Sequence, residues 1–191
     1  MPKIVDRDQY RKELLMKSFD LFAEKGYGSL TMRQLAQGLG VSTGTLYHYF
    51  PTKEAIFEQL VEEQTQQDIM NFLGEASNAQ TLPERIKALF SFGAKNEDYF
   101  RKQTLLWVEF YQQQGRTEVL NNETLKRACD ATRAAIADYL LLQDKALIEF
   151  VYVLLNGLIV VPLFEGEKVS FSEQGELLAK MLTAYLEKAR G

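Results

Sequence analysis

The chain has one cysteine and one histidine among 191 residues, and each scarcity excludes a class of site. Cys129 is alone, so neither an internal disulfide nor a cysteine-rich metal site can form, and this usage is typical of a reducing cytoplasm. Because His48 is the sole histidine, a zinc centre lacks ligands and a catalytic Ser/His/Asp or Cys/His set lacks a free base. We therefore expect a cytoplasmic protein with no metal, no cofactor and no enzymatic activity.

Long hydrophobic runs are also scarce. The N-terminus is charged from its third residue and lacks the apolar core of a signal peptide. The most apolar run covers residues 150–164 and includes Asn156, Gly157 and Pro162. A bilayer-spanning helix needs about 20 residues, so we expect no membrane association. We expect this run to form a helix that is buried on most of its faces.

The sequence has no segment of sustained two-residue alternation, which predicts an all-α fold. Its composition, 46% hydrophobic and 25% charged residues, is that of an ordinary globular protein. Capping residues and helical apolar periodicity predict about nine helices. Their expected ranges are 8–25, 31–39, 42–50, 53–73, 83–100, 103–114, 118–142, 145–164 and 172–189.

Charge is distributed unevenly along the chain. Residues 1–53 contain eight Lys/Arg and five Asp/Glu, a net charge of +3, within a chain whose net charge is −4. The remaining residues therefore carry a net charge of −7. A basic N-terminal region on an acidic body is expected when only that region meets a polyanion such as DNA.

Residues 31–50, TMRQLAQGLGVSTGTLYHYF, have the pattern of a helix-turn-helix. Ala36 is small enough for a second helix to cross nearby, and Gly40 permits the positive φ of a tight turn. Val41 and Leu46 are expected to fill the core shared by the two helices. In this arrangement the second helix lies in the major groove of DNA.

The second helix divides into two faces. If Leu46 and Phe50 point inward, four residues point outward, and we expect them to contact bases: Thr43, Gly44, Tyr47 and His48. Arg33, in the first turn of the preceding helix, is expected to join them. Hydroxyls, an ammonium group and helix N-terminal amides are placed to bind phosphate, which predicts backbone contacts from Thr31, Thr45, Tyr49 and Lys53.

Other interpretations of these side chains remain open. Tyr47 and Tyr49 could fill the core, although both cannot point inward beside Leu46 and Phe50 on so short a helix. Lys53 could be an ordinary residue at a helix start, and Arg33 could bind a phosphate or a neighbouring carboxylate instead of a base.

This segment resembles the DNA-binding region of TetR-family transcriptional regulators over residues 22–63, FAEKGYGSLTMRQLAQGLGVSTGTLYHYFPTKEAIFEQLVEE. The most specific part of the match is Thr45-Leu46-Tyr47-x-Tyr49-Phe50-x-x-Lys53-Glu54. The resemblance implies a homodimer with an N-terminal three-helix head and a helical body that binds a small effector. It also implies base contacts from Arg33, Thr43, Gly44, Tyr47 and His48, and phosphate contacts from Thr31, Thr45, Tyr49 and Lys53.

We therefore expect a DNA-binding domain over 1–53, a connecting helix over 53–73, and an effector-binding and dimerisation domain over 54–191. Helices 145–164 and 172–189 are more apolar than one small bundle can hide, which predicts a four-helix interface between two copies. Aromatic side chains are expected to line a pocket for a small apolar or aromatic effector, although aromatic stripes on helices are usually core. The candidates are Phe72, Phe90, Trp107, Phe110 and Tyr111.

The resulting functional prediction is a transcriptional regulator that binds double-stranded operator DNA and, as a repressor, is released by a small molecule. One alternative is a DNA-binding protein that answers to a protein partner or to no effector. A second is an all-α enzyme, which the missing catalytic set and the missing glycine-rich phosphate loop disfavour.

Overall fold

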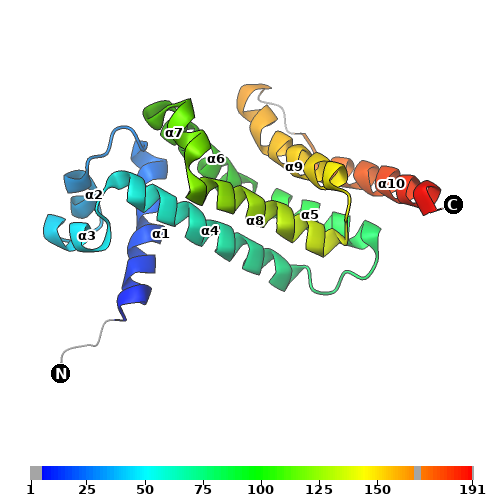
Figure 1. The fold of residues 1–191 in the computed structure, drawn as a ribbon, viewed down its shortest axis with the longest axis horizontal. Coiled ribbons are helices and arrows are strands. Elements are labelled where there is room, and N and C mark those ends of the chain that lie inside the picture. Colours follow the sequence, from blue (N-terminus) through cyan, green and yellow to red (C-terminus); the bar gives the residue numbers. More distant parts are fainter. Residues whose placement is uncertain (1–5, 166–168, 191) are drawn as a thin grey trace. The chain divides into compact units, whose positions relative to one another are not determined.

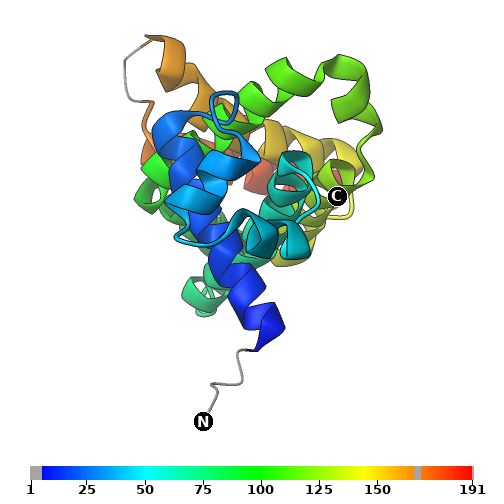
Figure 2. The same cartoon turned by 90° about the vertical axis from the view of Figure 1, so that its left-hand side faces the viewer.

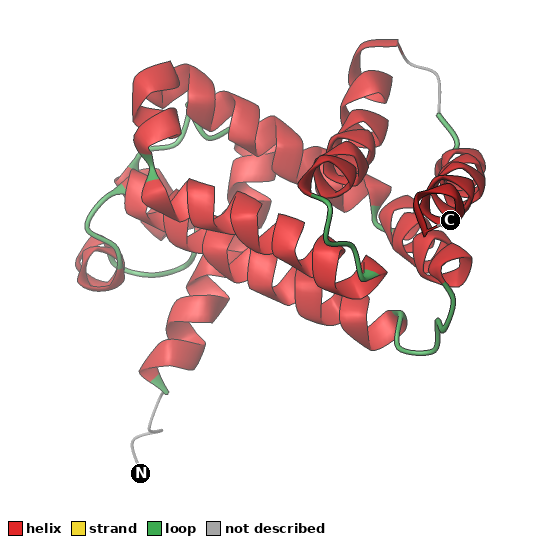
Figure 3. Cartoon of the chain, turned by 45° about the vertical axis from the view of Figure 1, so that its right-hand side comes forward, coloured by secondary structure: helices red, strands yellow, loops and turns green. Residues whose placement is uncertain are grey.

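The computed structural model describes residues 6–165 and 169–190, which form helices and no strands (Figure 3). The predicted all-α fold is thus confirmed, with ten helices in these residues where about nine were expected (Figure 1). In chain order they are α1 Arg7–Lys25, α2 Met32–Gly38, α3 Thr43–Tyr49, α4 Lys53–Glu75, α5 Leu82–Lys95, α6 Glu97–Gln114, α7 Arg116–Asn121, α8 Glu123–Leu140, α9 Lys145–Glu165 and α10 Phe171–Arg190.

The chain forms two compact units, neither of which is continuous in sequence. Unit 1 comprises Met1–Gln66 and Leu105–Cys129, and unit 2 comprises Gln67–Thr104 and Asp130–Gly191. Helices α4, α6 and α8 each contribute residues to both units. The compact units therefore do not divide at residue 53, where the sequence suggested a boundary between functions. That functional division stays a prediction.

Helix starts in the head follow the capping residues that the sequence suggested. Thr31 caps α2 in a capping box with Gln34, and the Ser42 hydroxyl accepts the Thr45 N–H at 2.9 Å at the start of α3. Each cap satisfies an amide that the first helical turn leaves without a partner. Gly40 has a φ of +69°, as expected for the turn between α2 and α3.

Three of the helices expected in the body, 83–100, 103–114 and 118–142, have other boundaries in the structure. Residues 83–100 were expected to form one helix, but α5 ends at Lys95, where the Asn96 side chain donates to the Phe92 carbonyl at 2.9 Å. An asparagine that bonds to nearby backbone in this way competes with helical geometry. Gly115, with a φ of +82°, ends α6, and the expected helix 118–142 is two helices separated at Asn122.

Unit 2 is built around close contact between α5 and α10. The aromatic rings of Phe90 and Phe171 are buried there. A Cβ at Gly93 would lie 2.7 Å from the Phe171 ring, and one at Gly175 would lie 2.9 Å from the Phe90 Cβ. Glycine at both positions allows the helices to approach within the space that these rings leave. The buried cluster also includes Phe72, Ile86, Ile136, Val151, Leu158, Leu178 and Leu182.

Helix α9 is less buried than its composition suggested. It was expected to be covered on most faces, yet only Val151 and Leu158 are fully buried. Its opposite face and one face of α10 leave apolar side chains exposed: Phe150, Val153, Val161, Phe164, Leu177, Met181 and Tyr185. By length and composition alone, α9 could also cross a membrane. One such helix is weak evidence for a membrane span, because mostly buried core helices of soluble proteins pass the same test.

Substitution of the glycine at the α5–α10 contact tests this packing. We expect Gly175→Ala to lower the free energy of unfolding by about 1–3 kcal/mol, because the new methyl group would press on Phe90. Urea denaturation measures the change. Gly74→Ala is the matched control: a Cβ there meets nothing within 4 Å, so we expect no loss and a gain of up to about 1 kcal/mol. Equal effects at the two positions would argue against the close contact.

Candidate nucleic-acid interface and effector region

Helix α3 has the two faces that the sequence predicted. Leu46 and Phe50 are fully buried, whereas the Tyr47 side chain is 51% exposed and Gly44 and His48 are exposed. Thr43 is half-buried. An exposed tyrosine ring contributes little burial free energy to folding, so the fold alone does not require an aromatic residue at position 47. The orientation of α3 is therefore confirmed, whereas contacts with bases stay a prediction.

The α2–turn–α3 geometry rests on a small set of contacts. Ala36 is buried between the helices, as expected, and its carbonyl accepts the Val41 N–H at 3.0 Å across the turn. Val41 is only half-buried, so it contributes less to the shared core than the sequence suggested. The head consists of α1, with 19 residues, and the seven-residue helices α2 and α3, drawn in blue to cyan in Figure 2, and the polar face of α3 points outward.

Gly44 has no structural reason to be glycine. Its φ is not positive, and the only atom within 4 Å of an added Cβ would be the Ser42 hydroxyl, at 3.8 Å. Glycine in a helix costs about 1 kcal/mol relative to alanine. The residue therefore points to a requirement outside the described chain, such as the close approach of another molecule to the backbone.

Arg33 is exposed at the start of α2 and makes no ion pair or hydrogen bond within residues 6–165 and 169–190. The sequence left open a carboxylate partner for this side chain, and the structure has none in those ranges. Its guanidinium is consequently available to an external acceptor.

Two of the three hydroxyl groups predicted to bind phosphate, those of Thr31 and Thr45, already have local partners. The Thr31 hydroxyl donates to the Gln34 side chain at 2.8 Å, and the Thr45 hydroxyl lies 2.8 Å from that of Ser42. Tyr49 is half-buried and packs edge-to-face on Tyr10 with ring centroids 5.6 Å apart. A hydroxyl can donate and accept together, so these contacts leave some bonding capacity unused.

Lys53 is oriented by Tyr27. Its ammonium donates to the Tyr27 carbonyl at 2.9 Å and lies 4.2 Å from the centroid of the Tyr27 ring. Partial burial lowers the Lys53 pKa, because it disfavours the charged form. An ammonium has three N–H donors, so the hydrogen bond to the Tyr27 carbonyl leaves two of them for a phosphate.

Tyr27 lies among three other aromatic rings of unit 1, a packing role that was not anticipated from the sequence. It is fully buried against Phe22, Phe57 and Phe110, with ring centroids 5.2, 5.6 and 5.4 Å away. Burial is the main cause that raises its pKa. Its backbone N–H donates to Glu109 of α6 at 2.5 Å. Glu109 lies between Val108 and Phe110, and this apolar setting is the signal in the sequence by which such a buried partner could have been found.

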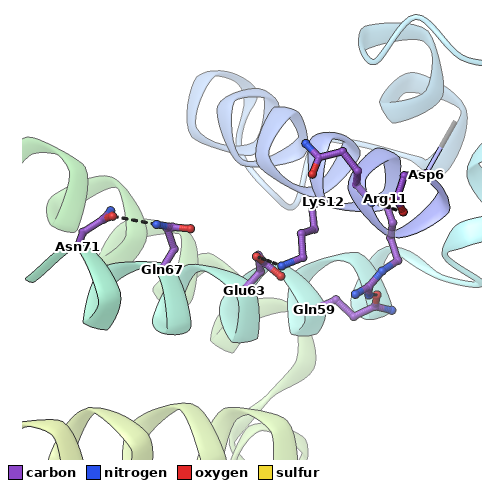
Figure 4. A network of polar contacts seen from close by, with 8 residues as sticks. Asp6, Arg11, Lys12, Gln59, Glu63, Gln67 and Asn71 are labelled. Atoms are coloured by element: carbon purple, nitrogen blue, oxygen red, sulfur yellow. Dashed lines mark hydrogen bonds and ion pairs between the residues drawn. The ribbon is translucent and has the colours of Figure 1, made fainter. Parts of the chain in front are cut away.

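Polar contacts also join α1 to α4 within unit 1. Figure 4 shows Arg11 and Lys12 of α1 reaching Gln59 and Glu63 of α4. The Lys12 ammonium lies 2.8 Å from the Glu63 carboxylate. These contacts fix the direction in which α4 leaves the head.

The five residues predicted to line an effector pocket fall into both units. Phe110 is buried and stacks on Phe57 with centroids 3.9 Å apart, beside half-buried Trp107, whereas Tyr111 is 44% exposed. Phe72 and Phe90 belong to the unit 2 core. Phe90 also borders an open groove of about 630 Å³ between α5 and α10, with Lys87, Thr183 and Glu187 on its walls. A pocket-lining role for the five stays a prediction.

A polar cluster inside unit 2 was not anticipated from the sequence. The Asp68 carboxylate of α4 accepts a hydrogen bond from the Gln103 amide of α6 at 3.0 Å, and Gln103 also donates to the Tyr99 hydroxyl at 2.8 Å. Burial raises the pKa of Asp68 to about 6, although hydrogen bonds from Gln103 and Tyr99 partly oppose this effect.

Comparison with known proteins places the head in a family. Residues 14–60 match the family model described as bacterial regulatory proteins, tetR family. The nucleoid occlusion factor SlmA of Haemophilus ducreyi is 34% identical over 102 residues, about half of each chain. The transcriptional repressor Rv1474c of Mycobacterium tuberculosis is 37% identical over 68 residues, or 35% of this chain and 36% of that one. The chain thus spans half or less of the length of these curated relatives.

Solved structures share the fold over nearly the whole chain. A transcriptional regulator of Saccharomonospora viridis in complex with choline superposes with a TM-score of 0.65 at 17% identity, covering 91% of this chain and 95% of that one. The regulator FadR of Bacillus subtilis in complex with stearoyl-CoA gives a TM-score of 0.63 at 19% identity, covering 90% and 96%. At such identity the likeness concerns the fold alone. The family and these neighbours are regulators, not enzymes.

The polar cluster of unit 2 yields a test by pH. Because the folded-state pKa of Asp68 is raised from 3.8 to about 6, its stabilising contribution is present below pH 4 and is lost as pH rises through 6. We expect Asp68→Asn to raise the free energy of unfolding relative to wild type as pH rises from 4 to 8, by up to about 3 kcal/mol. Urea denaturation across this range measures the difference. A difference that does not vary with pH would contradict the assignment.

Proposed function

Because residues 14–60 match the tetR family of bacterial regulatory proteins, we propose that the chain is a repressor of that family whose homodimer binds operator DNA and is released by a small effector. The observation that carries the proposal is the face of α3. Tyr47, His48 and Gly44 are exposed above buried Leu46 and Phe50, within the segment that matches the family model.

We assign the outer face of α3 to the major groove. Arg33, Thr43, Gly44, Tyr47 and His48 would contact base edges. The exposed guanidinium of Arg33 and the open surface at Gly44 support this assignment. Thr31, Thr45, Tyr49 and Lys53 would contact phosphates. The hydrogen bond from Lys53 to the Tyr27 carbonyl supports the phosphate contact of Lys53, because it holds the ammonium in one position at the start of α4.

Dimerisation follows from the unburied faces of α9 and α10. An isolated chain would expose Phe150, Val153, Phe164, Met181 and Tyr185 to water, each of them at least half-exposed. Apolar surface of this extent marks a contact with another protein or with a membrane, and we assign it to a second copy of the chain. A second copy would cover it with the same faces, in a four-helix interface with two-fold symmetry. Two heads could then meet major-groove sites about 34 Å apart.

We assign effector binding to the body. Two solved neighbours of the same fold carry choline and stearoyl-CoA, so this architecture accommodates ligands of different chemistry. In this chain the rings of unit 2 support a ligand with an apolar or aromatic part, as the sequence suggested. Phe72 contributes to that unit, with Phe92 and Tyr139 in edge contact.

Release from DNA would be a shift in population between two conformations. A difference of about 1–3 kcal/mol in effector affinity for the two states is enough for regulation. Helix α4 begins at Lys53, within the proposed DNA-contacting set, and extends through Asp68 and Phe72 of unit 2. Helix α6 supplies Glu109, which holds the Tyr27 amide. These two helices are the candidates for transmission. A DNA-binding regulator acts where the chromosome is, so we propose the bacterial cytoplasm as its location.

The DNA interface is tested by Gly44→Ala and Tyr47→Ala. Neither change touches the core, so we expect the melting temperature to stay within a few degrees of wild type, with a slight rise for Gly44→Ala. DNA affinity should fall about 10-fold or more for each, as expected for loss of a close approach or of a base contact. Fluorescence anisotropy with a duplex selected by the wild-type protein measures this.

Gln37→Ala is the control, because Gln37 is exposed on α2 and lies outside the proposed contact set. If Gly44→Ala and Tyr47→Ala bind the duplex as tightly as Gln37→Ala, the assignment of this face to DNA is wrong.

The dimer is tested by placing a charge on the exposed apolar face of α10. We expect Met181→Glu to give a monomer in light-scattering chromatography, because a buried unpaired carboxylate at an interface costs several kcal/mol. DNA affinity should fall with it. Lys180→Glu is the control, since Lys180 borders the α5–α10 groove instead. A Met181→Glu protein that stays dimeric would place the interface elsewhere.

A further inference from the structure

Within residues 6–165 and 169–190, Asp68 lacks the cationic partner that several other acidic residues of unit 2 have. Glu75 lies 2.9 Å from Lys95, Glu97 lies 2.5 Å from Arg101, and Glu149 lies 2.7 Å from Arg133. The Asp68 carboxylate has only the neutral partners Gln103 and Tyr99, and within residues 6–165 and 169–190 no basic side chain lies within 4 Å of it. Burying an unpaired carboxylate costs free energy, which an incoming positive charge would recover.

The carboxylate is held in a fixed direction. Gln103 bridges Asp68 and Tyr99 with its two amide hydrogens, at 3.0 and 2.8 Å. Tyr99 and Gln103 lie on α6 one turn apart, whereas Asp68 lies on α4. An acid that two side chains orient while its charge stays uncompensated is arranged for a ligand more than for stability. Asp68 is half-buried, so a molecule from solvent can reach it.

A series of contacting aromatic rings leads from Tyr99 in this cluster to Phe72 on α4. The Tyr99 ring contacts Phe100 with centroids 5.4 Å apart, Phe100 contacts Phe92 at 5.9 Å, and Phe92 contacts Phe72 at 5.4 Å. Phe72 lies one helical turn after Asp68. The rings of Tyr99 and Phe100 on α6 and of Phe92 on α5 are half-buried. Together with Phe72 they connect the cluster around Asp68 to the next turn of α4. Ring faces attract cations and apolar groups alike.

We propose that the effector of this regulator is an organic cation, a substituted ammonium whose charge pairs with Asp68 and whose apolar substituents contact the rings of Tyr99, Phe100, Phe92 and Phe72. The inference rests on the proposed function and specifies the class of its effector. A metal ion does not fit, because one carboxylate supplies too few ligands, and the described residues contain no group of three metal-binding side chains.

The test compares a charged probe with its uncharged isostere. Calorimetric titration of the full-length protein with choline should give measurable binding, and 3,3-dimethylbutan-1-ol, which has the same shape without the charge, should bind about 10- to 100-fold more weakly. Asp68→Asn should lose the same factor for choline, because asparagine can still accept the bonds from Gln103 and Tyr99 but carries no charge. Glu75→Gln removes a charge from the same helix and should bind choline as wild type does.

Three results would overturn the inference: no choline binding by the wild-type protein, equal binding of the isostere, or unchanged choline binding by Asp68→Asn. The Asp68→Asn protein is expected to be at least as stable as wild type, so loss of binding cannot come from unfolding. Titration of the same samples with the selected DNA duplex separates this inference from the proposed function. If the protein binds DNA but does not bind choline, only the proposed effector class is contradicted. If it does not bind DNA, the proposed function as a DNA-binding regulator is contradicted.

Discussion

The burial of Leu46 and Phe50 is the constraint on which the DNA-binding face depends. Helix α3 has only seven residues, so fixing these two side chains in the core determines where every other side chain on it points. Tyr47 and His48 follow Leu46 directly and must lie on the outer face. Ser42 at one end and the Phe50–Pro51 turn at the other prevent the helix from lengthening or shifting in register. A short helix with two buried anchors presents a polar surface in one orientation only.

Tyr27 plays the corresponding part for the rest of unit 1. Its ring is enclosed by α1, α4 and α6, its amide is held by Glu109, and its carbonyl holds Lys53. A head that shares its core with α6 cannot change its internal packing independently of that helix. This explains why the compact unit includes Leu105–Cys129 as well as the head. The sequence-based boundary followed the resemblance, whereas the compact units follow the contacts between distant segments of the backbone.

Much of the head could be predicted because its signals are local. Thr31, Gly40 and Ser42 act on backbone within three residues of themselves, and the spacing of Leu46 and Phe50 defines a face without reference to other helices. The body was less predictable because its determinants come from distant segments. The Asp68–Gln103 pair joins residues 35 positions apart, and the Tyr27–Glu109 pair joins residues 82 apart. Neither pair leaves a periodic trace in the sequence.

The prediction that α9 is buried on most of its faces was wrong for a different reason. An apolar helix has the same composition whether it is covered by its own chain or by a second copy.

The central claim, that the outer face of α3 meets DNA, is tested most directly by amide chemical-shift mapping during titration with a selected duplex. The account predicts the largest shifts at the backbone amides of Gly44, Tyr47 and His48, with Leu178 and Leu182 of unit 2 little changed. Shifts confined to unit 2, with α3 unperturbed, would contradict it.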